Sequence, residues 1–317
     1  MTVTIRRLAT DDRAGLEAYV RIRNATQPDN PDSLEHLAWE DETYPGAATR
    51  LLAETPTGSA IGAASTGRVY IYPEAYERAW IGVWVMPEWR RGGVGTALLR
   101  AAGDAARGAG KTGFELELSE AHAAGHAFLA AHGFVEVDRS MAVALELAGL
   151  EPPAVDPPPG IRLVTLAERP DLLAGVHRVA VEAFPDIPSA DEPLYAGTLE
   201  EYIARDVDRP GIRRDAFQVA IDGSDGEAVG FASLMFAPGS TRIAWHDMTA
   251  VRPAWRGRGI ASALKRATIA WALANGVETL ETGNDESNAP MRAVNAALGY
   301  RPQPDYVGLQ GPLPPRR

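Results

Sequence analysis

The spacing of apolar and polar residues predicts the same order of strands and helices in each half of this chain. Thr2–Leu8 and Ile161–Leu166 alternate between the two kinds of position and predict strands. Each precedes a helical stretch that begins near acidic residues, which suit a helix N-terminus. Further strands are expected at Arg50–Glu54, Ala60–Ser65, Trp80–Val85 and Phe114–Leu118, and then at Phe217–Ile221, Ala228–Leu234, Ile243–Val251 and Glu278–Thr282, with long helices at Val94–Arg107 and Ile260–Ala274.

Mixed strands and helices with a strand–loop–helix crossover predict an α/β class (an α+β mixed sheet) built as two similar lobes. Residues 151–160 are rich in proline, which favours an extended spacer. We therefore expect an N-terminal domain at 1–150, a linker at 151–160 and a C-terminal domain at 161–317.

The same nine-residue pattern stands at the end of one strand in each half. Pro87-Glu-Trp-Arg-Arg-Gly-Gly-Val-Gly is echoed by Pro253-Ala-Trp-Arg-Gly-Arg-Gly-Ile-Ala, 166 positions later. Gly133-Phe134 and Gly299-Tyr300 keep the same spacing of 166. A repeat of this length indicates a duplicated domain, because solenoid repeats span a few tens of residues.

Glycines between a strand and a helix allow close approach of a diphosphate to the first amides of the helix, which have no intrahelical partner. The helix dipole adds partial positive charge there, and Arg90 and Arg256 add more. The motif lacks the Gly-Lys-Ser/Thr ending of a Walker loop and the spacing of a dinucleotide fold. The two loops therefore predict two diphosphate sites of another kind.

Composition narrows the function classes. The net charge of −11 argues against a nucleic-acid partner and is compatible with a cationic substrate such as an amine. The absence of cysteine excludes disulfides and thiolate catalysis. The start of the chain has no signal-peptide pattern and no apolar run approaches a membrane span, so we expect a cytoplasmic protein with no membrane partner. Arginine far outnumbers lysine, which indicates bacterial codon usage.

Both halves resemble GNAT (GCN5-related) N-acetyltransferases. Val85-x-Pro87…Arg90-x-x-Gly93-x-Gly95 and Val251-x-Pro253…Arg256-x-x-Gly259-x-Ala261 look like the acetyl-CoA pyrophosphate motif of that family. The tandem arrangement is similar to that of mycothiol synthases. The resemblance implies acetyl-CoA as co-substrate, held in a gap beside the splayed strand. The residues it implies for CoA binding are Val83, Val85, Arg90, Arg91, Gly92, Gly93, Val94, Gly95 and Thr96 in the first copy, and Met248, Thr249, Val251, Arg256, Gly257, Arg258, Gly259, Ile260, Ala261, Asn284 and Asn288 in the second.

The family commonly protonates the leaving thiolate with a tyrosine, and this chain departs from that pattern. Asn295 stands at the equivalent position of the second copy and Leu129 at that of the first. Asn295 can donate a hydrogen bond to sulfur but is no acid. Since a CoA thiol can leave as thiolate, the change need not abolish activity.

The second copy carries more polar residues near its motif. Asp247 and Glu281 are candidate bases, with Asn295 beside the thiol. Strand alternation places His246 on the opposite face from Asp247 and Thr249.

Candidate groups in the first copy are fewer. Glu115 and Glu117 project from one side of a strand, as they also would in a half-exposed strand. His122, His126 and His132 lack a carboxylate partner in register, so no metal is expected.

These observations predict an acetyl-CoA-dependent N-acetyltransferase acting on a primary amine of a small molecule. The C-terminal copy is expected to be catalytic, and the N-terminal copy a degenerate or structural CoA binder. Two alternatives stay open: acetylation of a protein or peptide amine, and a non-catalytic acyl-CoA sensor.

Overall fold

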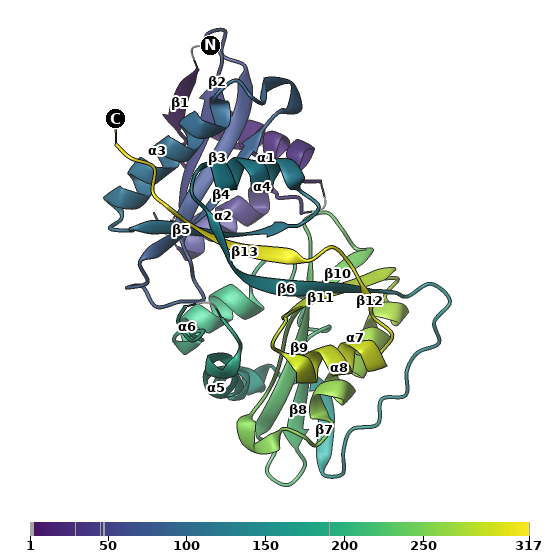
Figure 1. The fold of residues 1–317 in the computed structure, drawn as a ribbon. Helices are drawn as coiled ribbons and strands as arrows, with labels where there is room; N and C mark the ends of the chain where they lie inside the picture. Colours follow the sequence, from purple (N-terminus) through teal and green to yellow (C-terminus); the bar gives the residue numbers. More distant parts are fainter. Residues whose placement is uncertain (1–2, 29, 45, 47, 190, 317) are drawn as a thin grey trace. The chain divides into compact units, whose positions relative to one another are not determined.

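The computed structural model describes residues 3–28, 30–44, 46, 48–189 and 191–316. Contacts divide the chain into two compact units (Figure 1). Unit 1 comprises Met1–Val137 with Val307–Arg317, and unit 2 comprises Asp138–Tyr306. Thr2, which the sequence placed in the first strand, lies outside the described residues.

The elements of the two halves follow the same order. The first half has β1 (Thr4–Arg7), α1 (Arg13–Thr26), α2 (Leu34–Thr43), β2 (Ala48–Glu54), β3 (Ala60–Arg68), β4 (Arg78–Val85), α3 (Val94–Gly108), β5 (Gly113–Ser119), α4 (Ala123–Ala131) and β6 (Val135–Glu146). The second has β7 (Ile161–Thr165), α5 (Leu173–Ala183), α6 (Leu199–Tyr202), β8 (Gln218–Asp222), β9 (Ala228–Phe236), β10 (Ile243–Val251), α7 (Ile260–Ala274), β11 (Thr279–Asp285), α8 (Ala289–Ala297), β12 (Arg301–Pro302) and β13 (Tyr306–Pro312).

Each unit is a mixed sheet with helices on both faces, which confirms the expected fold class. Strand order is β1-β2-β3-β4-β5-β13 in unit 1 and β7-β8-β9-β10-β11-β6 in unit 2, where β12 also pairs with β6. Neighbouring strands are antiparallel in most pairs, and the parallel pairs are β4–β5 and β10–β11. A helix crosses over between the two strands of each parallel pair, as such pairs require.

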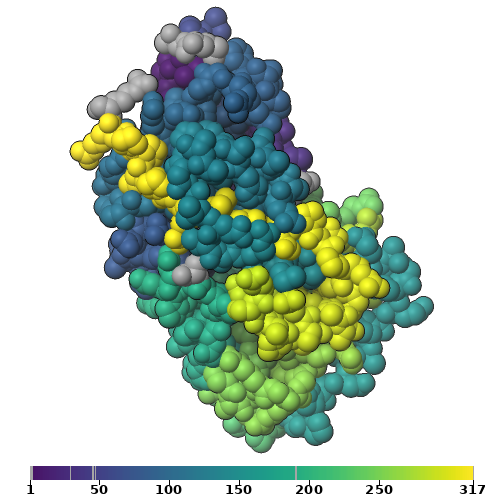
Figure 2. Space-filling model, in the orientation of Figure 1, coloured from purple at the N-terminus to yellow at the C-terminus, as the bar shows by residue number. Residues whose placement is uncertain are grey.

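The last strand of each half completes the sheet of the other half. β6 follows α4 in the sequence, yet its residues from Asp138 onward belong to unit 2, where Ser140–Glu146 pair with β11. β13 is the last strand of the chain, and it belongs to unit 1 from Val307 onward. Figure 2 shows the yellow C-terminal tail on the surface of the blue N-terminal unit. The compact units therefore differ from the sequence ranges 1–150 and 161–317, because a division by sequence cannot show an exchange of strands.

Two apolar layers fill each unit. In unit 1, α3 packs on one face of the sheet through Leu98 and Leu99, and α1 packs on the other through Tyr19 and Ile22. In unit 2, α7 and α5 take the same places. Because these helices cover both faces, the buried strands are apolar on both sides, and few positions remain for polar groups inside.

Candidate functional site

The glycine loop of unit 2 opens the first turn of α7. After β10 the chain forms a short 3-10 turn at Pro253–Trp255, and Gly257 and Gly259 then adopt φ angles of 74° and 85°. Gly259 is the N-cap of α7, and no atom lies within 4 Å of where a Cβ of Gly257 would stand. The loop thus presents the first amides of a 15-residue helix beside bare backbone, which is the geometry of an anion site.

The loop of unit 1 has the same backbone. Gly93 caps α3 with φ of 84°, and no atom lies within 4 Å of its hypothetical Cβ. Arg91 stands where unit 2 has Gly257, and it holds a φ of 64°. Among the described residues, Arg91 is the only one other than glycine with positive φ. A side chain in this region costs about 1 kcal/mol or more, so the surrounding structure imposes the loop conformation on unit 1.

The motif arginines brace the loops in both units. Arg256 Nε donates to the carbonyl oxygen of Val251 at 3.1 Å, and Arg90 Nε donates to that of Val85 at 3.0 Å. Arg256 Nη1 also pairs with Asp186 Oδ2 at 2.7 Å. Arg258 instead stacks over Trp255, with its guanidinium carbon 4.6 Å from the ring centroid. The arginine of each motif therefore fixes the loop to the end of the preceding strand.

A gap opens between the parallel strands beside each loop. β10 pairs with β11 only from Ile243 to Trp245, and β4 pairs with β5 only from Arg78 to Trp80. Beyond those residues the strands separate. Within the described part of the chain, the backbone of β10 from His246 to Val251 has no strand partner on the side that faced β11, so an extended ligand could pair with it.

A β-bulge in β10 corrects the expectation that His246 and Thr249 lie on opposite faces. His246 pairs with Leu234 and Thr249 with Ala232, so two residues of β10 stand opposite Ser233 alone. His246 and Thr249 consequently share the face covered by α7. Asp247 lies on the other face, where Ser233 Oγ donates to its Oδ2 at 3.5 Å. Simple alternation failed because the bulge inserts one residue.

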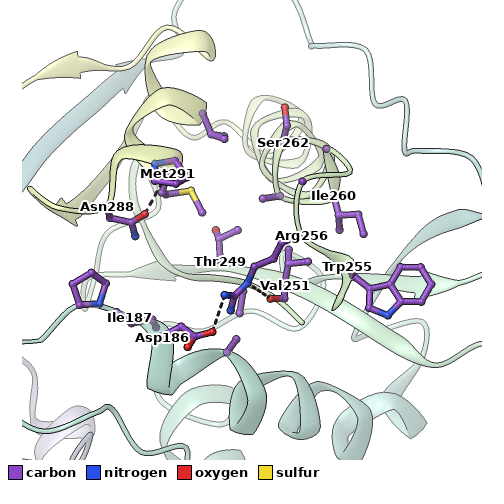
Figure 3. Close-up of a pocket in the computed structure, with 18 of the residues that line it drawn as sticks. Asp186, Ile187, Thr249, Val251, Trp255, Arg256, Ile260, Ser262, Asn288 and Met291 are labelled. Atoms are coloured by element: carbon purple, nitrogen blue, oxygen red, sulfur yellow. Dashed lines mark hydrogen bonds and ion pairs between the residues drawn. The ribbon is translucent and has the colours of Figure 1, made fainter. Parts of the chain in front are cut away.

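A cavity of about 580 Å³ lies beside the unit 2 loop (Figure 3). Thr249, Val251 and Ile260 form its floor near β10 and α7, and Asn288 and Met291 approach from the side of α8. Thr249 Oγ1 is buried and has no hydrogen-bond partner among the described residues. The remaining lining residues are Ala183, Asp186, Ile187, Pro188, Ala250, Trp255, Arg256, Gly257, Gly259, Ala261, Ser262, Ser287, Pro290 and Val294.

These features fit an extended thioester carrier. The bare loop offers amides to a diphosphate, the unpaired edge of β10 offers backbone to an amide-containing arm, and Thr249 offers a buried hydroxyl without a partner. A mostly apolar cavity of this size with a few polar groups is typical of a small-molecule site.

Carboxylates gather on the opposite face of the unit 2 sheet. Burial raises the pKa of Asp247 and raises that of Asp206 to about 6. Asp206 lies in a π-helical turn, Ile203–Val207, a feature often found at functional sites. Arg205 pairs with Asp206, and the rise in the pKa of Asp247 is opposed by the charge of Arg209, by the hydrogen bond from Ser233 and by the charge of Arg205. Glu281 pairs in register with Trp245, so strand alternation places it on the face of Asp247.

A polar chain crosses the interior on the α7 face. Lys265 Nζ donates to Asn295 Oδ1 at 2.7 Å, and Asn295 Nδ2 donates to Asn284 Oδ1 at 2.6 Å. Lys265 is 1% exposed, and burial lowers its pKa to about 7. Sequence reasoning proposed Asn284 and Asn295 but missed Lys265. The signal was available, because Lys265 stands in the repeat register of Leu99.

The corresponding places in unit 1 are filled by aromatic rings. The ring of Phe128 lies against Gly95, where an added Cβ would be 3.2 Å from Cε2. The indole of Trp84 folds over Gly82, and an added Cβ there would be 2.2 Å from Cη2. Trp84 Nε1 also donates to Gln27 Oε1 at 3.0 Å, which holds the ring in place. In unit 2 the equivalent of Phe128 is Val294, and Asp247 occupies the bulge that replaces Gly82.

The other sequence candidates of unit 1 contact neighbouring residues of that unit. Tyr76 donates a hydrogen bond to Glu115. His126 bonds Ser119 O, and His132 lies between Thr96 and Phe128. Across the described part of the chain, no three His, Asp or Glu residues converge as metal ligands would. A search of the same residues finds no helix both long and apolar enough to span a membrane.

A model of the acetyltransferase (GNAT) family matches the chain twice, over residues 16–134 and 177–300. A search of curated proteins finds no match. The tandem GNAT protein from the clavulanic acid biosynthesis pathway superposes with a TM-score of 0.78 at 24% identity, covering 100% of both chains. A GCN5-related N-acetyltransferase from Sphaerobacter thermophilus gives 0.71 at 22% identity, covering 99% of this chain and 97% of that one. A glucosamine N-acetyltransferase region of a fungal multi-domain GH3 β-N-acetylglucosaminidase gives 0.72 at 14% identity, covering 97% of this chain and 38% of that one.

Proposed function

The chain belongs to the acetyltransferase (GNAT) family, and from that premise we propose that its C-terminal copy transfers an acetyl group from acetyl-CoA to a primary amine of a small molecule. The observation that carries the proposal is the cavity of unit 2, where the glycine loop, the unpaired edge of β10 and the start of α8 with its N-cap Asn288 meet. The N-terminal copy is proposed as a degenerate or structural CoA binder.

The binding half of the proposal assigns the diphosphate to the amides that open α7, beside Gly257 and Gly259. The backbone of Thr249 and Val251 pairs with the pantetheine arm, and Asn288 and Met291 close the cavity from α8. Thr249 Oγ1 gains the partner that it lacks. The acetyl group then lies in the gap between β10 and β11.

The chemical half uses both faces of the sheet. The acceptor approaches from the face that carries Asp247 and Glu281, and Asp247 takes a proton from the amine, directly or through water. The amine nitrogen forms a bond to the carbonyl carbon as the carbon–sulfur bond breaks, and the electron pair remains on sulfur. The raised pKa of Asp247 supports this role, because a base of ordinary aspartate pKa is a weak proton acceptor.

The inactive role of the N-terminal copy rests on its aromatic rings. Phe128 packs at Gly95, where the cavity would begin, and Trp84 covers Gly82 on the acceptor side. Unit 1 has no bulge in β4, whose pairing with β3 is continuous from Ala79 to Val85. The loop backbone survives, so weak binding of the diphosphate end is compatible with lost catalysis.

A matched pair of glycine variants tests the assignment. Both variants, Gly93→Val and Gly259→Val, place a side chain at a residue with nearly the same positive φ, 84° at Gly93 and 85° at Gly259. An added Cβ would have no atom within 4 Å at Gly93 and would meet Pro158 Cγ at 3.9 Å at Gly259. We expect Gly259→Val to lower release of free CoA from acetyl-CoA at least a hundredfold across a panel of amines, and Gly93→Val to leave it within twofold. Loss of turnover in Gly93→Val alone would refute the assignment of the catalytic copy.

The same panel separates the two alternatives. Peptides as the preferred acceptors would indicate protein or peptide acetylation. Acetyl-CoA binding by calorimetry with no CoA release across amines, aminoglycosides, amino acids and peptides would indicate a non-catalytic sensor.

A further inference from the structure

The polar chain of unit 2 has an apolar counterpart in unit 1 at all three positions. Lys265, Asn295 and Asn284 stand 166 residues after Leu99, Leu129 and Leu118. The matching helices and strands of the two units begin and end at residues with the same spacing: α3 with α7, α4 with α8, and β5 with β11. Leu99 and Leu129 are buried in the core of unit 1, and Leu118 packs against it. The fold itself therefore accepts leucine at these positions.

The direction of the hydrogen bonds follows from the chemistry of the amine. A lysine ammonium can only donate, so Asn295 must accept through Oδ1 and present its NH2 group to Asn284. Asn284 then accepts through its own Oδ1. Its Nδ2 has no hydrogen-bond partner among the described residues and forms the donor end of the chain, on the part of β11 that has separated from β10. A charge at the head of such a chain polarises each following donor.

We propose that Lys265 is a positioning residue that, through Asn295 and Asn284, stabilises the thiolate released from the acyl carrier in the C-terminal site. This inference rests on the proposed function. It supplies the group that stabilises the leaving thiolate, because this chain has Asn295 where the family commonly has a tyrosine. Asn284 Nδ2 donates a hydrogen bond to the sulfur as the carbon–sulfur bond breaks. The electron pair stays on sulfur, the amine proton goes to Asp247 or water, and Lys265 keeps its own proton throughout.

The surroundings of Lys265 favour a functional charge over a structural one. Burying an ammonium costs more free energy than burying leucine, which unit 1 uses instead. The ring of Tyr300 lies 5.5 Å from Nζ and offers a cation–π contact. The titratable groups facing Lys265 are His246 from β10 and Tyr300 after α8. Burial holds the pKa of His246 well below neutral and raises that of Tyr300, so both are neutral near pH 7.

The test measures the thiol of bound CoA, because that readout needs binding but no acceptor. Ultraviolet absorbance of the thiolate is followed against pH for CoA bound to the full chain and to Lys265→Met. We expect the pKa of the bound thiol to rise by at least one unit in Lys265→Met, a tenfold loss of thiolate at a given pH. The variant Leu99→Met, at the matched position of unit 1, should leave it unchanged.

Turnover gives the second readout. Lys265→Met is expected to lower kcat at least tenfold while the KM for acetyl-CoA stays within about twofold. Because Met could disturb packing, the triple variant Lys265→Leu, Asn295→Leu, Asn284→Leu, which copies unit 1, should give the same result with cooperative unfolding retained. An unchanged thiol pKa in either variant overturns this inference alone. Failure of the unmodified chain to bind CoA overturns the proposed function and this inference with it.

Discussion

Arg256 and Asp186 form an ion pair at the edge of the unit 2 cavity, with 2.7 Å between Nη1 and Oδ2. Figure 3 shows this pair beside the hydrogen bond from Arg256 to Val251. The carboxylate neutralises the motif arginine that braces the loop. The ion pair thus braces the loop and places a carboxylate beside the proposed diphosphate site.

Asp186→Asn should therefore tighten acetyl-CoA binding. The change removes repulsion of the diphosphate and frees the charge of Arg256. Since both side chains are roughly half exposed, we expect only about a threefold decrease in Kd at low ionic strength, shrinking as salt is added. Titration calorimetry at two salt concentrations checks this. Asp171→Asn, which breaks an exposed pair with Arg169, is the control and should bind as the unmodified chain does.

Asp247→Asn should abolish the base without weakening acetyl-CoA binding, because Asp247 lies on the opposite face of the sheet from Thr249. We expect kcat/KM to fall about a hundredfold or more. In the unmodified chain kcat/KM should be lost as pH falls through the raised pKa of Asp247, above the usual range of aspartate. Two acceptor amines of different pKa distinguish this limb from titration of the acceptor. A limb that moves with the amine would argue against Asp247.

Lys265→Leu should change the pH dependence of stability. Burial lowers the pKa of Lys265 from 10.5 to about 7, so the folded state binds fewer protons than the unfolded state between these values. The stability contribution of Lys265 is present above about pH 10.5 and is lost as pH falls through 7. Urea unfolding should show that the free energy of unfolding of the unmodified chain, relative to that of Lys265→Leu, rises between pH 7 and pH 10 by on the order of a few kcal/mol. A constant difference would mean that Lys265 stays protonated in the folded state over this range, with a pKa close to its unfolded value.

Gly311→Ala should destabilise unit 1, although Gly311 lies at the far end of the sequence from most of that unit. An added Cβ would stand 2.4 Å from Cγ of Phe134, inside the core that β13 completes. We expect a loss of about 1–3 kcal/mol, seen by calorimetry as a lower unfolding temperature. Gly108→Ala is the matched control at the end of α3, where no atom lies within 4 Å, and it should be neutral or slightly stabilising. Equal effects would show that β13 contributes little to unit 1.

The sequence alone predicted the main helices, strands and glycine loops, because interactions within a few residues determine them. The expected helix at Ile260–Ala274 has the observed bounds, and Asn288 caps α8 as its position before Ala-Pro indicates. The prediction that Thr249 lies on the opposite face of β10 from His246 was wrong, because the bulge depends on how β10 pairs with β9. Lys265 was missed because one lysine on an apolar helix face carries no local pattern, and its partners Asn295 and Asn284 come from two other elements.

By itself, the sequence determined that one α/β unit is built twice and that each copy opens a helix with a bare glycine loop, since turn and cap chemistry is local to a few residues. Only the tertiary structure decided how the two sites differ, because Phe128 and Trp84 pack onto glycines in unit 1, whereas a residue is inserted into β10 of unit 2. The exchange of β6 and β13 was equally invisible, because backbone hydrogen bonds between strands are indifferent to which part of the chain supplies them.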